Sequence, residues 1–259
     1  MVVIGVACCM AISSCSDDKD EPSGGESNPV NPTTVFVNGI PKQVGNMAMS
    51  TNNDGLVSHI ADGNVNVAVT YSYLSRANAS DVIINIDESD KQCTVNVSLN
   101  SLGYSKYWKT IWKGGDWEER WFEYNSDGQL QKMKISNSEG SGSIDFIYAN
   151  GNIANVKMSP ADGGTMTLSY GNTPIKNNGG IMLYQIYGID DTAMQYAYYI
   201  GILGKGTVNL PVKNDMVFDG DRILETYDWI LNENGMPTKM TLNHTEPDYT
   251  DTEEMLFKW

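Results

Sequence analysis

The chain has few of the residues that carry familiar chemistry. Among its 259 residues are two histidines, His59 and His244, which lie far apart in the sequence. A Ser-His-Asp triad or a histidine-rich metal site would need accompanying motifs that are absent. The acidic segments 87–90 and 219–221 lack the ligand spacing of a calcium loop, and no glycine loop has the surroundings of a nucleotide site. The sequence therefore predicts no catalytic residue, no bound metal and no cofactor.

Basic residues are also scarce. The chain has 17 Lys and Arg against 32 Asp and Glu, which gives a net charge of -15. Residues 16–32 account for -4 of this total, so the remainder of the chain carries -11. A protein with this charge is repelled by phosphate backbones and by anionic surfaces. We therefore expect no nucleic-acid partner.

Long apolar runs are missing, and after residue 15 no stretch approaches the length of a transmembrane helix. A short apolar run near the start passes through Ile12-Ser13-Ser14 to Cys15, and an acidic run follows it. This pattern predicts a lipoprotein signal peptide at 1–14 and lipidation of Cys15, although no Lys or Arg precedes the cysteine. The alternative is a buried apolar strand or helix. A lipidated N-terminal cysteine carries more than one acyl chain and would be a stable membrane anchor.

The rest of the chain divides into a tether and a domain. Residues 15–32 comprise the lipidated cysteine and an acidic segment rich in Ser, Gly, Asn and Pro, which predicts a flexible tether. Residues 33–259 are then a single domain. If Cys8 and Cys9 leave with the signal peptide, Cys93 is the remaining unmodified cysteine, so no intramolecular disulfide is expected. Cys93 lies in a strand-like segment and is expected to be a half-buried small apolar residue.

Period-2 alternation dominates this domain. Val65, Val67 and Val69 alternate with polar or small residues, and segments 82–86 and 94–99 read as a hairpin. Asn-Gly or Asp-Gly turns recur within 53–60, 125–133, 150–156 and 232–240, often after an aromatic strand. The sequence predicts an all-β fold, an antiparallel meander of hairpins that forms a curved or closed barrel-like sheet. We expect about 14 to 16 strands of roughly five or six residues each.

One segment departs from the alternation. Residues 191–203 begin with Asp191 and Thr192, which suit a helix N-terminus, and end near Gly204. A short helix is favoured over a long aromatic strand, because the following Asn209-Leu210-Pro211 indicates a stop and a turn.

These features together resemble a family of Bacteroidetes lipoproteins known as a domain of unknown function with a porin-like fold. The resemblance rests on the cysteine motif at Cys15, Asn38-Gly39-Ile40-Pro41, the repeated Gly hairpins and Gly204-Lys205-Gly206. It covers most of the chain from about residue 33. It implies a curved or closed antiparallel sheet and offers no catalytic residues. The acidic run after Cys15 also resembles the export signal of such lipoproteins, which implies an outer-membrane, cell-surface location.

The candidate binding site is a concentration of aromatic side chains around the 113–116 turn. Exposed aromatic faces stack on sugar rings, and neighbouring carboxylates accept hydrogen bonds from hydroxyls. The candidate ligand-binding residues are Trp108, Trp112, Trp117, Trp121, Tyr124 and Glu119. The alternative is that these aromatics fill the core, because large aromatic residues are usually buried.

The leading hypothesis is a non-enzymatic lipoprotein whose partners are the membrane, through its anchor, and a glycan or protein ligand. A carbohydrate-active enzyme is the second hypothesis, in which Glu118, Glu119 or Glu123 would face another carboxylate. A structural role in envelope assembly is the third. The aromatic C-terminus, Met255 to Trp259, also raises the alternative of a membrane-spanning barrel. The short strands with polar residues on both faces argue against this alternative.

Overall fold

The computed structural model describes residues 30–72, 80–89, 91–159, 164–174, 192–218 and 220–259. The predicted signal peptide at 1–14, the lipidation site Cys15 and the tether as far as residue 29 lie outside the described residues. They stay predictions from the sequence.

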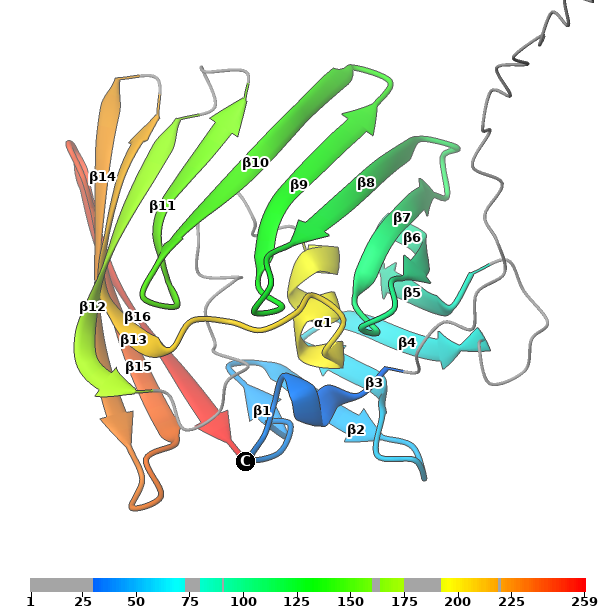
Figure 1. The fold of residues 1–259 in the computed structure, drawn as a ribbon, viewed down its shortest axis with the longest axis horizontal. Helices are drawn as coiled ribbons and strands as arrows, with labels where there is room; N and C mark the ends of the chain where they lie inside the picture. The colour runs from blue at the N-terminus through cyan, green and yellow to red at the C-terminus, as the bar shows by residue number, and fades with distance from the viewer. Residues whose placement is uncertain (1–29, 73–79, 90, 160–163, 175–191, 219) are drawn as a thin grey trace, which may run out of the picture.

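Sixteen strands form one closed antiparallel barrel (Figure 1). The strands are β1 (Gln43–Val44), β2 (Met47–Thr51), β3 (Val57–Asp62), β4 (Val65–Tyr71), β5 (Val82–Glu88), β6 (Lys91–Leu99), β7 (Ser105–Trp112), β8 (Trp117–Tyr124), β9 (Leu130–Asn137), β10 (Gly140–Ala149), β11 (Asn152–Ser159), β12 (Thr165–Pro174), β13 (Asn209–Phe218), β14 (Asp221–Leu231), β15 (Pro237–Glu246) and β16 (Tyr249–Lys258). Each strand pairs with its sequence neighbours, and β1 closes the ring by pairing Val44 with Phe257 of β16. The predicted meander is confirmed, and the sheet is closed.

Side chains alternate between the lumen and the outer face along each strand, as the pleat requires. In β5, Ile84 and Ile86 are buried in the lumen, whereas Asn85 and Asp87 are exposed on the outside. The buried apolar side chains of the barrel belong to one contiguous cluster. The wall therefore encloses an apolar core and turns its polar face outward, the reverse of a water-filled porin channel.

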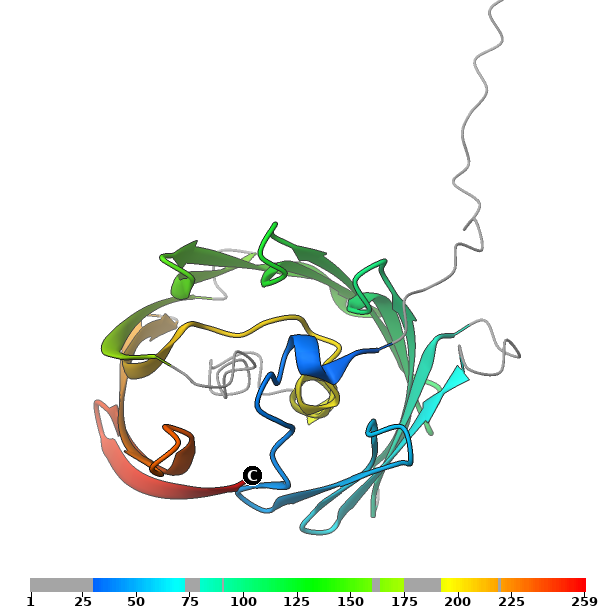
Figure 2. The same ribbon diagram turned by 60° about the horizontal axis from the view of Figure 1, so that its bottom comes forward.

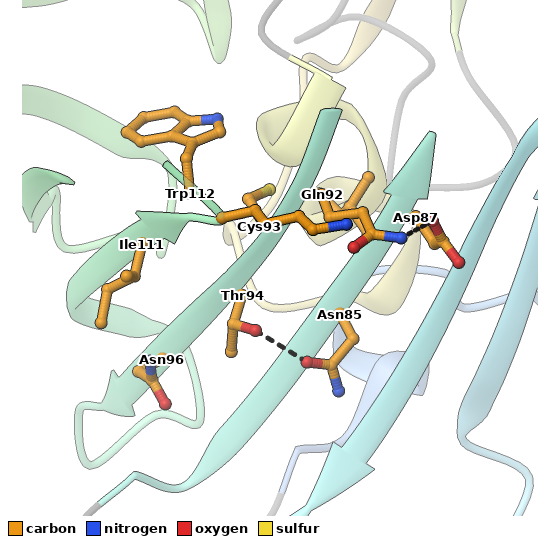
Figure 3. Close-up of a pocket in the computed structure, with 10 residues that line it drawn as sticks. Asn85, Asp87, Gln92, Cys93, Thr94, Asn96, Ile111 and Trp112 are labelled. Atoms are coloured by element: carbon orange, nitrogen blue, oxygen red, sulfur yellow. Dashed lines mark hydrogen bonds between the residues drawn. The ribbon is translucent and has the colours of Figure 1, made fainter. Parts of the chain in front are cut away.

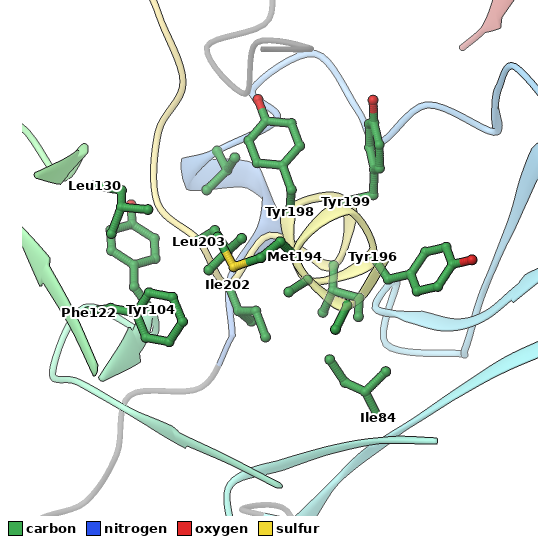
Figure 4. Packing of buried hydrophobic residues seen from close by; sticks show 14 of the residues in the cluster. Ile84, Tyr104, Phe122, Leu130, Met194, Tyr196, Tyr198, Tyr199, Ile202 and Leu203 are labelled. Atoms are coloured by element: carbon green, nitrogen blue, oxygen red, sulfur yellow. The ribbon is translucent and has the colours of Figure 1, made fainter. Parts of the chain in front are cut away.

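The helix α1 (Thr192–Ile200) stands inside this ring (Figure 2). Met194, Tyr196 and Tyr199 have almost no exposed surface, and they pack among lumen side chains such as Ile84 and Phe122 (Figure 4). A helix that is apolar on all sides needs such an enclosure. The predicted short helix within 191–203 is confirmed, and the strand alternative for this segment is wrong.

The helix ends in a Schellman motif. The N–H of Gly201 donates to the carbonyl of Tyr198, and the N–H of Ile202 donates to the carbonyl of Ala197. Gly201 has a φ of +88°, which favours glycine. A Cβ at this position would also lie 3.2 Å from Pro32.

Residues 201–208, here called the strap, fasten the helix to hairpin turns at one end of the barrel. Lys205 N–H donates to the Gly128 carbonyl at 2.8 Å. The buried side-chain amide of Gln129 donates to the carbonyls of Gly206 at 2.8 Å and Gly151 at 2.9 Å. Closing this end of the barrel buries backbone groups, and these hydrogen bonds give those groups partners. Gly204-Lys205-Gly206 therefore has a structural role here.

The N-terminal segment also enters the lumen. The short 3-10 helix η1 (Pro32–Thr34) is capped by Asn31, whose side chain accepts from Thr33 N–H at 3.2 Å. Phe36 then packs on the rings of Tyr198 and Tyr199, with ring centroids 5.7 and 6.2 Å apart. The core thus joins segments more than 150 residues apart in sequence.

Four hairpin turns at the strap end share an Asn-x-x-Gly form. The asparagines are Asn52, Asn100, Asn125 and Asn232. Each side-chain oxygen accepts from the N–H groups two and four residues later at 2.9–3.0 Å. The glycine three residues after each asparagine has a φ between +73° and +80°.

The sequence identified three of these turns but assigned them a two-residue form, which is wrong. The asparagine side chain substitutes for a backbone acceptor and closes a longer loop. Of the recurring turns, Asn150-Gly151 has the expected form, with φ values of +54° and +78° at its two central residues.

Aromatic side chains near the strap end make a second recurring contact. An aromatic O–H or N–H of one strand, or of the residue directly after it, donates to a carbonyl near the start of the preceding strand at 2.6–2.9 Å. The pairs are Tyr71 to Val57, Tyr148 to Leu130, Tyr170 to Ile153, Trp229 to Pro211 and Trp259 to Pro237. Each bond satisfies a carbonyl at a strand end and fixes the aromatic ring in the lumen. This hydrogen bond explains why aromatic residues precede several of the turns in the sequence.

The strands are longer than the sequence suggested. β10, β12, β13, β14, β15 and β16 each contain 10 or 11 residues. The expectation of five or six residues is wrong for these strands, because they run the full height of a barrel that encloses a helix. Short strands are therefore no argument against a membrane-spanning barrel.

Charge on the outer wall supplies that argument instead. Lys132 pairs with Asp145 at 2.7 Å, and Lys213 and Arg222 both pair with Asp215. A Lys or Arg on a lipid-facing wall costs about 2–4 kcal/mol at the bilayer midplane. The outer face of the described barrel is therefore suited to water. Separately, none of the described helices has the length and hydropathy to cross a membrane.

Candidate functional site

The hairpin of β7 and β8 sorts the candidate aromatic residues onto two faces. Its outward positions hold Tyr107, Lys109 and Ile111 on β7 and Trp117, Glu119 and Trp121 on β8. The register pairs Tyr107 with Trp121, Lys109 with Glu119 and Ile111 with Trp117. Three cross-strand pairs therefore stand side by side on the outer wall.

Glu119 is the centre of a hydrogen-bonded network on this wall. Its carboxylate accepts from the Tyr107 hydroxyl at 2.9 Å and from Lys109 Nζ at 3.0 Å. These two bonds lower the pKa of Glu119. Burial, the bond to Glu119 and the charge of Glu119 raise the pKa of Tyr107 to about 12. Near neutral pH Glu119 is therefore an anion, and Tyr107 stays a hydrogen-bond donor.

Two tryptophans flank this network. Trp117 is 37% exposed and Trp121 is 39% exposed. Lys109 lies over the Trp117 ring, 5.2 Å from its centroid, and Tyr107 packs against Trp121 with ring centroids 5.6 Å apart. Each indole is thus held by a polar neighbour while keeping surface in water. We call Ile111, Trp117 and Trp121 the outer ridge.

Shallow hollows adjoin each member of the outer ridge. The hollow beside Ile111 has a volume of about 640 Å³ and is lined by polar residues of β5 and β6, among them Asn85, Gln92 and Thr94 (Figure 3). Thr94 donates to Asn85 at 2.9 Å, and Gln92 donates to Asp87 at 2.7 Å. Amide and hydroxyl groups are therefore fixed next to an exposed apolar side chain.

Two further hollows lie beside the tryptophans. The one at Trp117 measures about 600 Å³ and includes Asn137 and Glu139. The one at Trp121 measures about 830 Å³ and crosses β9 and β10, where Lys134 and Ser136 line it. The outer ridge is thus bordered by polar hollows over β5 to β11.

The other three predicted aromatic residues do not join this surface. Trp108 is fully buried in the lumen, where its ring meets Phe122 edge-on at 4.7 Å. Tyr124 also faces the lumen, packs against Tyr104 and has a pKa raised by burial. Trp112 occupies a lumen-side position at the end of β7, is half-buried and borders two of the hollows. Of the predicted set, Trp117, Trp121 and Glu119 come together on the outer wall.

The three carboxylates considered for hydrolysis are each engaged by a cation. Glu118 faces the lumen and pairs with Arg120 at 2.5 Å. Glu119 pairs with Lys109, and Glu123 with Lys134 at 3.0 Å. Glu118 and Glu119 stand on opposite sides of the wall, so the two cannot flank one glycosidic bond.

Several polar residues of the hollows were not identified from the sequence. Asn85, Gln92 and Thr94 lie on β5 and β6, the two strands before β7, and the register places β6 beside β7 and β5 beside β6. Their alternation with buried Val and Ile gives the one available signal, which marks them as outward-facing residues.

Comparison with known proteins places this geometry in context. Residues 43–239 match the family model described as domain of unknown function (DUF4595) with porin-like fold. A porin-like protein from Bacteroides uniformis has a similar structure, with a TM-score of 0.58 and 16% identity over 82% of this chain and 87% of that chain. Another from Bacteroides vulgatus has a TM-score of 0.55 and 11% identity over 85% and 98% of the two chains. At these identities the similarity concerns the fold. None of the curated proteins matches the chain.

Proposed function

Because the chain belongs to the family of domains of unknown function with a porin-like fold, we propose a function from its outer wall. The protein is a lipid-anchored, surface-exposed lipoprotein whose barrel binds a glycan without chemical turnover. The observation that carries this proposal is the exposure of Trp117 and Trp121 on either side of Glu119.

The chemistry of the outer ridge fits a sugar. An indole face stacks on the apolar face of a sugar ring, while Lys109 donates hydrogen bonds and the oxygens of Glu119 and of the Tyr107 hydroxyl accept them. Trp117 and Trp121 are four residues apart on one strand, so their Cα atoms are separated by about 13 Å. A ligand that touches both is longer than one sugar ring, which favours an oligosaccharide.

The anchor and the outer wall support the proposed location. The motif at Cys15 would hold the chain to a membrane by its acyl chains, and a charged outer wall would then remain in water. Carbohydrate turnover is the less supported alternative, because Glu118, Glu119 and Glu123 each pair with a basic side chain.

A glycan array tests the proposal. The probe is the chain from residue 16 onward, because Val30 is already buried in the core and Pro32 is buried in η1. We expect specific retention of an oligosaccharide, and loss of most of it in Trp117→Ala and Trp121→Ala. The matched control is Tyr249→Ala, which removes an aromatic side chain 55% exposed on β16.

The outcomes separate binding from folding. Thermal unfolding of each variant shows whether the barrel is intact. Retention unchanged in both tryptophan variants would place the binding elsewhere. A folded wild-type chain that retains no glycan would instead favour a protein partner or a role in envelope assembly.

A further inference from the structure

A row of buried polar side chains crosses the lumen face of three neighbouring strands. The register pairs Asn214 of β13 with Glu225 of β14, and Glu225 with His244 of β15. Asn214 is 0% exposed and Glu225 is 7% exposed, in an interior that is mainly apolar. Buried polar groups in such surroundings require partners.

Glu225 is held from one side. Its Oε2 accepts from the Tyr227 hydroxyl at 2.5 Å and from Asn214 Nδ2 at 3.4 Å. Its Oε1 lies 3.5 Å from His244 Nδ1, a long contact for a hydrogen bond. Burial and the charge of Glu225 raise the pKa of Tyr227, which therefore remains a donor. Oε1 is left with capacity for another donor.

Asn214 supplies a second acceptor. Its Oδ1 is buried and accepts no hydrogen bond from the residues that the structure describes. Leaving a buried carbonyl oxygen in this condition costs free energy. Among the described parts of the chain, Asn214 Oδ1 and Glu225 Oε1 thus both lack a close donor, and their side chains are adjacent in the row.

The surrounding charge is negative, and the row adjoins exposed residues of β16. His244 Nε2 is 3.0 Å from Glu246, and Asp251 and Glu253 share the lumen face because they pair with His244 and Leu242. Residues 249–254 are exposed on both faces of β16. Solvent therefore reaches the lumen along this side.

We propose that this row binds a ligand bearing a primary ammonium group, at a lumen site separate from the outer ridge. Two ammonium N–H groups donate to Asn214 Oδ1 and Glu225 Oε1, and the positive charge complements Glu246 and Asp251. A metal ion is less suited, since within the described part of the chain no group of three or more His, Cys, Asp or Glu side chains is placed to hold one. The site does not depend on glycan binding.

Histidine ring NMR tests the site, because the chain contains two histidines. His244 reports on the row, and His59 on β3 is an internal reference. The full chain is titrated with n-butylammonium and, at equal ionic strength, with tetramethylammonium, which carries the charge without N–H donors. We expect a saturable shift of the His244 signals with n-butylammonium alone and no change at His59.

Variants complete the test. Glu225→Gln keeps the shape of the side chain and should weaken n-butylammonium binding by about tenfold or more, as expected for loss of a charge-assisted hydrogen bond. The matched control Glu254→Gln removes an outward carboxylate that pairs with Lys239 and should have no effect. No saturable shift at His244, or equal shifts with both cations, would overturn the proposal even if Glu225→Gln failed to fold.

Discussion

At the scale of single residues, two glycines with nearly equal backbone angles separate conformational strain from crowding. Gly55 has a φ of +76° and Gly204 has a φ of +78°. A Cβ at Gly55 would meet nothing within 4 Å, whereas a Cβ at Gly204 would lie 2.5 Å from the Gly128 carbonyl oxygen and 2.8 Å from the Tyr124 ring. The strap approaches the β8–β9 turn closely at this glycine.

We therefore expect Gly55→Ala to cost about 1–2 kcal/mol from the left-handed conformation alone. Gly204→Ala should cost clearly more, because the strap must also move away from Gly128. Urea unfolding of both variants measures the difference in the free energy of unfolding. Equal losses for the two variants would show that the strap does not pack as described.

The aromatic residues show what a sequence can say about a site. Period-2 alternation puts Trp117, Glu119 and Trp121 on one face of a strand, and this follows from the sequence alone. Which face looks outward does not follow, because both faces of β8 carry large side chains. The answer depends on the curvature of the closed sheet and on the helix that fills its lumen.

At the scale of elements, α1 and the segment before β1 form a common plug. The sequence predicted the helix from its capping residues and its stop signals. It held no signal for placing the helix inside the barrel, because that position depends on contacts such as Phe36 with Tyr199, which are remote in sequence. The Asn-x-x-Gly turns were predicted as two-residue turns, which is wrong because an asparagine side chain closes a longer loop.

Adjacent residues test the plug directly. Phe36 is 2% exposed and packs on two tyrosines, whereas Val37 is 49% exposed. Phe36→Ala should destabilise the protein by about 3–5 kcal/mol, and Val37→Ala should stay within about 0.5 kcal/mol. Calorimetric unfolding measures both. A small loss for Phe36→Ala would mean that residues 30–40 are not part of the core.

At the scale of the whole molecule, an apolar lumen holds many tyrosines in their neutral form. Burial is the main cause of the raised pKa of Tyr148, Tyr170, Tyr196 and Tyr227. A raised pKa in the folded state favours folding below the ordinary tyrosine pKa of about 10 and loses that contribution as the pH rises above it.

The free energy of unfolding should therefore fall steeply above about pH 10, because the unfolded chain releases these protons first. Denaturant unfolding at a series of alkaline pH values gives the slope. Tyr170→Phe removes one such group and should make the slope shallower. Stability that is unchanged well above pH 10 would contradict the burial of these hydroxyl groups.

The distribution of polarity is also a property of the whole molecule. The barrel has the porin-like fold of its family. Its wall nevertheless carries charged pairs on the outside, and its lumen is mainly apolar and contains a helix. Period-2 alternation in the sequence predicted an antiparallel sheet that is either curved or closed. Which face of the sheet points into the lumen could not be predicted, because a barrel with an apolar lumen and a channel with a polar lumen have the same period-2 alternation.

The central claim is that ligand binding takes place on the outer ridge. Acrylamide quenching of tryptophan fluorescence, measured with and without a glycan retained on the array, tests it most directly. The account predicts that saturating glycan protects the exposed indoles from quenching, and that a chain carrying both Trp117→Ala and Trp121→Ala loses this protection while Trp108 stays shielded in the lumen. Saturable glycan binding with unchanged quenching would contradict the claim.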